Sequence, residues 1–159
     1  MKIIVLSDTH SSPLPAALVR EIAGADMVVH AGDFADIGFY RQLEAMKDVR
    51  AVYGNMDGMA LRECLPKQTV FECEGVRIGL VHGEGSPVGM VDRLARQFKD
   101  QGVKIVVFGH SHEPYNETLG GIIFFNPGSP TDKIRAPYLS YGVLELKDGK
   151  VKAKIVRLG

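Results

Sequence analysis

Five short runs of mostly β-branched, apolar residues each end in glycine or in polar side chains. The length and composition of the runs predict largely buried strands of an α/β sheet. Their polar ends contain four of the five histidines and three aspartates. Because the loops after the strands of such a sheet converge on one crevice, we expect these side chains to lie together. The runs and their ends are KIIVLS and DTH (residues 2–10), DMVVH and AGD (26–33), RAVY and GNMD (50–57), VRIGLV and HG (76–83), and KIVVF and GHSH (104–112).

Helices are predicted between several of these strands. The clearest pattern spans residues 88–101, where apolar residues recur at helical spacing and charged residues take the opposite face. Pro13 and Pro15 suit the start of another helix, and a third is indicated near residues 37–43. The apolar faces are Val91, Leu94, Ala95 and Phe98; Leu14, Leu18 and Ile22; and Ile37, Tyr40 and Leu43.

Only strands are predicted beyond residue 114. The turn sequences at 120–121 and 148–149 predict two hairpins, and the turn at 74–75 predicts an earlier one. The pattern therefore indicates an α/β fold with an appended antiparallel part, in one domain over residues 1–159.

The composition of the chain narrows the classes of partner that we expect. Lys+Arg and Asp+Glu balance at 19 each, so we expect no stable nucleic-acid complex and no membrane surface as partner. No apolar run approaches the roughly 20 residues of a membrane span, which favours a cytoplasmic protein. Cys64 and Cys73 lie nine residues apart without a CxxC arrangement, and we expect both to be reduced.

The polar strand ends offer carboxylate, imidazole and amide donors, a mixed set that suits divalent first-row metals. The set is too large for one tetrahedral ion. With Asp33 bridging, it suits two ions about 3.5–4 Å apart, the arrangement used for in-line displacement at phosphorus. We expect Gly109 to turn the chain so that His110 and His112 reach different ions.

The order DTH, GD, GNMD, HG and GHSH resembles the five sequence blocks of the calcineurin-like metallophosphoesterases. NPGS at residues 126–129 and the short chain resemble the small bacterial and archaeal phosphodiesterase branch, to which the eukaryotic retromer scaffold subunit is related. The resemblance implies a four-layer αββα sandwich with the metal site at the carboxyl ends of the strands.

The same resemblance implies a role for each matching residue. Asp8, His10 and His112 would hold the first ion, Asp33 would bridge, and Asn55, His82 and His110 would hold the second. Attack of a metal-bridging hydroxide on a small phosphoester, with a nucleotide derivative as one candidate, is the implied reaction. Manganese is the first choice of metal, with iron, nickel, cobalt and zinc chemically reasonable. The residues assigned to catalysis are Asp33, Asn55 and Asp57, the last by orienting a ligand or loop through hydrogen bonds.

Met56 departs from the family pattern, which in many relatives has a histidine at this position that stabilises the transition state or protonates the leaving group. A thioether cannot donate a proton. We therefore predict a preference for aryl esters or diesters over alkyl monoesters.

Other interpretations remain open for some residues. A structural zinc held by Asp8, His10, His110 and His112 leaves the remaining donors unexplained, and a non-catalytic metal-binding scaffold of the same fold is the main alternative. We expect His30 to be structural, because it lies within a strand. Asn126 and Ser129 have an ordinary turn composition, and an exposed C-terminal edge strand offers a route to a homo-oligomer. Four basic residues are candidate phosphate contacts or solvated surface: Arg62, Lys67, Lys133 and Arg135.

Overall fold

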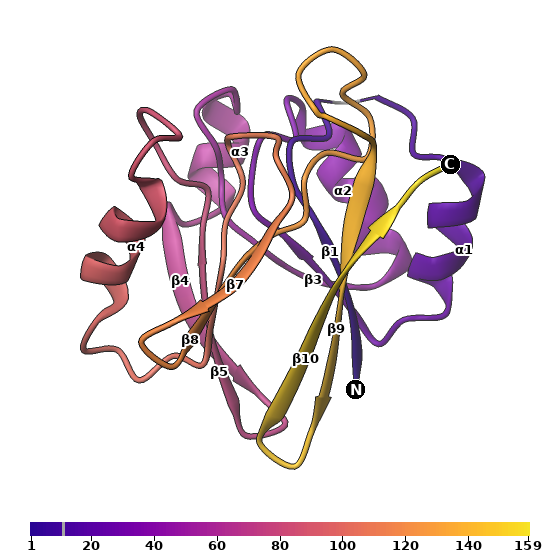
Figure 1. Cartoon of the computed structure of the whole chain (residues 1–159). Helices are drawn as coiled ribbons and strands as arrows, with labels where there is room; N and C mark the ends of the chain where they lie inside the picture. Colours follow the sequence, from indigo (N-terminus) through magenta and orange to yellow (C-terminus); the bar gives the residue numbers. More distant parts are fainter. Residues whose placement is uncertain (11) are drawn as a thin grey trace.

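The computed structural model describes residues 1–10 and 12–159, and its strands form two five-stranded sheets (Figure 1). In the first sheet β1 lies at the centre, parallel to β2 and antiparallel to β9. Its strands, in spatial order, are β10 (Lys150–Arg157), β9 (Ser140–Lys147), β1 (Lys2–Leu6), β2 (Met27–His30) and β3 (Asp48–Ala51).

The second sheet is built around β6, which is parallel to both of its neighbours, β5 and β8. Its strands, in spatial order, are β4 (Gln68–Cys73), β5 (Val76–Val81), β6 (Ile105–Val107), β8 (Ile122–Asn126) and β7 (Tyr115–Leu119). The parallel strands of both sheets run toward the same edge of the molecule, the upper edge in Figure 1.

Helices cover the outer face of each sheet, giving four layers (Figure 1). The helices are α1 (Ala16–Ala23), α2 (Ile37–Met46), α3 (Met59–Cys64) and α4 (Met90–Phe98). One apolar cluster joins α1, α2 and Leu61 of α3 to the first sheet, and another joins α4 to the second. A third cluster, which includes Ile3, Ile78 and Phe125, fills the space between the sheets. These three cores make the αββα sandwich that the resemblance implied.

Local patterns located most elements. Leu18 and Ile22 of α1, Tyr40 and Leu43 of α2, and Leu94 and Phe98 of α4 are buried as their spacing predicted. The three hairpins form at the predicted turns, where the second residue of each pair is a glycine with positive φ. The third strand was predicted over residues 50–53. In the structure it begins and ends two residues earlier, as β3 from Asp48 to Ala51.

One prediction from the residues was wrong, and one helix was missed. The C-terminal strands are not an appended part, because β9 pairs with β1 and β8 pairs with β6 inside the two main sheets. The helix α3 was not predicted, since its six residues are too few for a visible apolar period and only Leu61 is buried. In the part of the chain that the structure describes, no helix has both the length and the apolar character that a membrane span requires. Cys64 and Cys73 are free thiols, as expected.

Candidate metal centre

The polar strand ends come from both sheets and meet at the edge where the parallel strands finish. In the first sheet the backbone N–H of Asp8 donates to the carbonyl of Gly32 (3.0 Å), and in the second the N–H of Gly109 donates to the carbonyl of His82 (3.0 Å). A bond across the sheets joins the two sets of loops, because the N–H of His110 donates to the Asp8 carboxylate (3.1 Å). The structure thus brings all seven predicted metal ligands into one region.

Most of these donors sit on backbone that non-glycine residues rarely adopt. Positive φ angles, between 46° and 70°, occur at Asp8, His10, Asp33, His110 and His112. Such conformations cost of order 1–3 kcal/mol each and persist only where the surrounding structure enforces them. Their concentration at the strand ends makes this edge the candidate functional site.

Two glycines let the loops approach closely. A Cβ on Gly54 would lie 2.6 Å from the backbone nitrogen of Asp33, and one on Gly109 would lie 2.8 Å from Oδ2 of Asp8. Gly109 does not have a positive φ, so the left-handed turns are made by His110 and His112 themselves. The expected turn at Gly109 is therefore corrected: glycine is required there for space, not for conformation.

One group of donors consists of Asp8, His10 and His112, whose ligand atoms all lie within 4.8 Å of one another. Oδ2 of Asp8 accepts from Ser7 Oγ (2.6 Å) and from the N–H of His110 (3.1 Å). Oδ1 of Asp8 and Nε2 of His10 are buried without a hydrogen-bond partner among the described residues. Oδ1 also lies 3.2 Å from His112 Nε2.

The second group gathers around His82. Its Nε2 lies 3.0 Å from Asn55 Oδ1 and 3.3 Å from Asp33 Oδ2, and His110 Nδ1 lies 3.0 Å from the same Asn55 oxygen. Asp33 also lies 4.0 Å from His10 Nε2 in the first group. Its carboxylate thus lies near both groups. Asp8 shares this position, because its Oδ1 lies 3.9 Å from His82 Nε2 and it belongs to both clusters of candidate ligands.

Acceptors on the far side of three imidazoles fix their tautomers. Nδ1 of His82 donates to the carbonyl of Ala31 (2.7 Å), and Nε2 of His110 donates to the carbonyl of Gly85 (2.9 Å). Nδ1 of His112 bonds to the carboxylate of Asp132 at 2.6 Å. In the neutral rings, the other nitrogen of each then presents a lone pair to the centre of the site.

Negative charge dominates the interior of the site. Burial alone would lower the pKa of His82, but the carboxylates of Asp33 and Asp8 outweigh it and raise that pKa above its usual value. Burial likewise opposes a raised pKa at His112, where Asp8 and Asp132 prevail. Burial would raise the pKa of Asp33, yet His82 and the N–H of Met56 hold it below its usual value. The site therefore favours a positive charge at its centre.

These observations fit a divalent cation. Imidazole nitrogens, carboxylate oxygens and an amide oxygen face one another at about 3 Å. A positive charge among them, either a proton on an imidazole or a bound cation, relieves the repulsion between these acceptors. The buried Asp8 Oδ1 and His10 Nε2, which lack partners, are the orphaned atoms that such an ion would satisfy.

Asp57 supports the loops from beneath. Its buried carboxylate accepts from the backbone N–H groups of Asp33 (2.9 Å), Ala35 (2.8 Å) and Gly54 (2.8 Å). Burial raises its pKa in spite of these donors. Because both oxygens are occupied by the backbone, Asp57 holds the loop that carries Asp33 and does not face the donor cluster. This geometry agrees with the orienting part of its predicted role.

The NPGS turn and His30 also lie behind the site. Ser129 Oγ donates to the carbonyl of Asp8 (2.8 Å), and Asn126 Nδ2 donates to the carbonyl of Gly109 (3.0 Å). His30 is fully buried, stacks on Phe34 and accepts the N–H of Gly32 at Nδ1 (3.1 Å). All three support ligand-bearing loops, and His30 has the structural place expected of it.

Sequence reasoning missed Asp132, which contacts His112 and lies in the loop after β8. It belongs to no recognisable block, and only its tertiary position gives it a part in the site. The carbonyl of Gly85 was missed for the same reason, because backbone groups carry no sequence signal.

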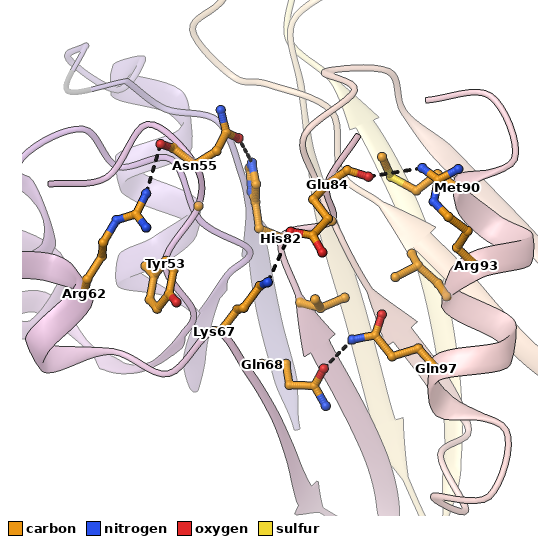
Figure 2. A pocket seen from close by; sticks show the side chains of 14 residues that line it. Tyr53, Asn55, Arg62, Lys67, Gln68, His82, Glu84, Met90, Arg93 and Gln97 are labelled. Carbon is orange, nitrogen blue, oxygen red and sulfur yellow. Dashed lines mark hydrogen bonds and ion pairs between the residues drawn. The ribbon is translucent and has the colours of Figure 1, made fainter. Parts of the chain in front are cut away.

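Two cavities flank the donor cluster. The α4 cavity, of about 420 Å³, reaches Asn55 and His82 and is lined further by Tyr53, Lys67, Met90 and Leu94. Figure 2 shows Arg62 and Tyr53 on one side of it and Met90, Arg93 and Gln97 on the other. The turn cavity, of about 520 Å³, is lined by His10, Ser12, Met56 and residues 131–135.

Comparisons with known proteins agree with this arrangement. Residues 1–149 match the family described as the calcineurin-like phosphoesterase superfamily domain. A probable metallophosphoesterase of Methanothermobacter thermautotrophicus is 35% identical, over 100% of this chain and 94% of that protein. A phosphodiesterase of Methanocaldococcus jannaschii is 28% identical, over 80% of this chain and 83% of that protein. The crystal structure of wild-type Vps29 of Entamoeba histolytica, complexed with Zn²⁺, superposes with a TM-score of 0.80 at 26% identity, covering 99% of both chains.

Proposed function

The chain belongs to the calcineurin-like phosphoesterase superfamily and is a metallophosphoesterase, and on that premise we propose that it is a dinuclear phosphodiesterase formed by one domain over residues 1–159. The observation that carries the proposal is the convergence of seven donor side chains from two sheets, with Asp33 4.0 Å from His10 and 3.3 Å from His82.

In this proposal, each donor group holds one divalent cation. Asp8, His10 and His112 hold the first, and Asn55, His82 and His110 hold the second. Asp33 belongs to both. Such a pair of ions would supply Lewis-acid chemistry, lowering the pKa of a water molecule between them and stabilising the charge that develops on the phosphoryl oxygens.

Other groups of the protein hold the donor side chains in place. Asp57 and the N–H of Met56, which donates to Asp33 Oδ1 (2.8 Å), keep the shared carboxylate in place. Gly85 and Asp132 hold the imidazoles of His110 and His112 in the tautomers that a cation requires. These contacts preorganise the site before substrate enters.

Met56 supports a preference for esters with good leaving groups. Its side chain lines the turn cavity next to His10 and is 59% exposed, so it is positioned to meet substrate. It cannot protonate a leaving oxygen. Substrates with good leaving groups, such as aryl diesters, should therefore react faster than alkyl monoesters. The preference for diesters over monoesters is supported by the relative from M. jannaschii that bears the name phosphodiesterase.

The first test compares two esters. Metal-stripped protein reloaded with manganese should hydrolyse bis-p-nitrophenyl phosphate faster than p-nitrophenyl phosphate and should bind two manganese ions per chain. Asp33→Asn should remove the activity and lower the metal content, while Asp148→Asn, the same change at an exposed turn, should alter neither. The proposal fails if diester cleavage does not require metal or survives in Asp33→Asn.

A second candidate is a non-catalytic metal-binding scaffold of the same fold, which the likeness to zinc-bound Vps29 favours. A scaffold that binds metal would also keep the donor set, so turnover separates the two candidates. Two bound ions without hydrolysis of either ester would decide for the scaffold. Manganese as the metal, a cytoplasmic location and a homo-oligomer stay predictions.

A further inference from the structure

The two cavities differ in how their charges are compensated. In the α4 cavity, Lys67 pairs with Glu84 at 3.1 Å. Arg62 donates to the backbone carbonyls of Asp57 (2.8 Å) and Asn55 (3.1 Å). Figure 2 shows the Lys67–Glu84 pair and the bond from Arg62 to Asn55 along the wall of the cavity. Arg93 likewise donates to the carbonyls of Glu84 (3.1 Å) and Val88 (3.0 Å). The arginines on this wall keep their positive charge, because carbonyls are neutral, but the donor groups named here are already engaged.

The rest of the α4 cavity suits a neutral, flat group. Val81, Met90 and Leu94 are buried apolar residues on its wall. Gln68 and Gln97 bond to each other through their amides and supply donors and acceptors at its outer end. An apolar surface beside a polar edge matches an aromatic ring or a nucleobase.

The turn cavity has the opposite character. Lys133 and Arg135 line it, and neither side chain has a hydrogen bond or ion pair among the described residues. The nearest carboxylate, Asp132, is already engaged: Oδ2 contacts His112, and Oδ1 accepts the N–H groups of Ile134 (2.9 Å) and Arg135 (3.0 Å). The two cations are therefore available to a ligand.

The turn that carries these cations is fixed to the donor cluster. Asp132 closes the turn through its two backbone acceptors, and its own N–H donates to Ser129 Oγ (2.9 Å), which in turn donates to the carbonyl of Asp8 (2.8 Å). Thr131 Oγ1 donates to the carbonyl of Thr9 (2.9 Å). Because the turn is held against the strand ends, the backbone that bears Lys133 and Arg135 has a defined place beside the first donor group.

We propose that the two cavities receive the two ester arms of a phosphodiester, and that the arm in the turn cavity carries a second anionic group bound by Lys133 and Arg135. This inference rests on the proposed phosphodiesterase function and names its substrate class. A monoester has one arm and would fill one cavity only, whereas a diester held at the donor cluster extends one arm to each side. The other arm is neutral and planar, and it occupies the α4 cavity.

A matched pair of chromogenic esters tests the proposal. Thymidine 5′-(p-nitrophenyl phosphate) and its 3′-phosphorylated form share the same diester and leaving group and differ by one phosphate. With manganese-loaded protein, we expect the 3′-phosphate to raise kcat/KM about fivefold to tenfold at low salt, as two exposed cations allow. The advantage should shrink toward one in 0.5 M salt, because exposed charges are screened.

Two double variants locate the effect. Lys133→Ala with Arg135→Ala should bring the ratio of the two esters to about one. Lys152→Ala with Lys154→Ala removes the same charge from the exposed face of β10 and should keep the ratio of the native protein. The inference is overturned if the native ratio is one, if the first double variant retains it, or if Lys67→Ala abolishes it instead.

Binding gives a readout independent of turnover. Thymidine 3′,5′-bisphosphate should bind more tightly than thymidine 5′-monophosphate, by a similar factor, and should shift the NMR signals of residues 131–135. If neither ester is cleaved, the proposed function fails, yet this comparison still decides on the anion-binding cavity. If the plain ester is cleaved and the 3′-phosphate brings no advantage in rate or binding, only the present inference fails.

Discussion

Replacing Asp132 by asparagine should change which nitrogen of His112 carries the proton. Oδ1 of Asp132 accepts two backbone N–H groups, from Ile134 and Arg135, so an asparagine oxygen must remain there. Its NH₂ group then takes the place of Oδ2, 2.6 Å from His112 Nδ1. A donor now faces that nitrogen, which must become an acceptor, and the proton moves to Nε2, which lies 3.2 Å from Asp8 Oδ1.

The expected consequence is weaker binding of one ion. A ring protonated at Nε2 has no lone pair to offer to the donor group of Asp8 and His10. Loss of such an outer partner typically costs 10- to 100-fold in metal affinity, which is about 1.4–2.8 kcal/mol. The fold should be little affected, because the backbone bonds at Oδ1 are kept and a neutral hydrogen bond replaces a charged one, a change of about 1 kcal/mol.

Calorimetric manganese titration of metal-stripped protein measures the effect, and ¹⁵N NMR of the imidazole nitrogens identifies the tautomer. Asp132→Asn should weaken one of two binding events and leave the other, with the proton of His112 on Nε2. Glu113→Gln removes the same charge at an exposed neighbouring position and should change neither. Unchanged affinity for both ions, or an unchanged tautomer in Asp132→Asn, would refute the reasoning.

Two further predictions concern stability. Gly54→Ala should lower the free energy of unfolding by about 1–3 kcal/mol, because the added Cβ would meet the backbone of Asp33. Gly58→Ala is the control, since the space around Gly58 is open and its stability should not fall. Denaturant unfolding of the two variants measures the difference. Burial lowers the pKa of His30 from its ordinary 6.5 to about 3, so its stabilising contribution is complete above pH 6.5 and is lost as the pH falls from 6.5 toward 3. By pH 4.5 the loss is about 3 kcal/mol, and His30→Gln should show a correspondingly shallower decline of its urea midpoint between pH 7 and pH 4.5.

The sequence identified those features whose signals are local. Strands with polar ends, amphipathic helices and Gly-containing turns were readable because each depends on neighbouring residues. The order of strands was not, since the pairing of β9 with β1 joins residues more than 130 positions apart. The resemblance to a family supplied the two-sheet architecture that residue patterns alone did not.

In the candidate site too, some residues could be predicted from local sequence and others could not. Asp8, Asp33 and the histidines stand at strand ends and were found by position. Asp132 lies in a loop without a motif, and its contact with His112 depends on how that loop folds back. The sequence also could not show which basic side chains are paired. Only the folded chain shows that Lys67 pairs with Glu84.

The division of the donors between two sheets has a mechanical consequence. The first sheet supplies Asp8 and Asp33, the second supplies His82 and His112, and an apolar layer joins the two sheets at their centre. A cation bound by both sets would link the two sheets at the edge where their parallel strands end. Metal binding should therefore make the whole molecule more rigid. Substitutions that shrink the apolar side chains between the sheets should first lower the affinity for the metal.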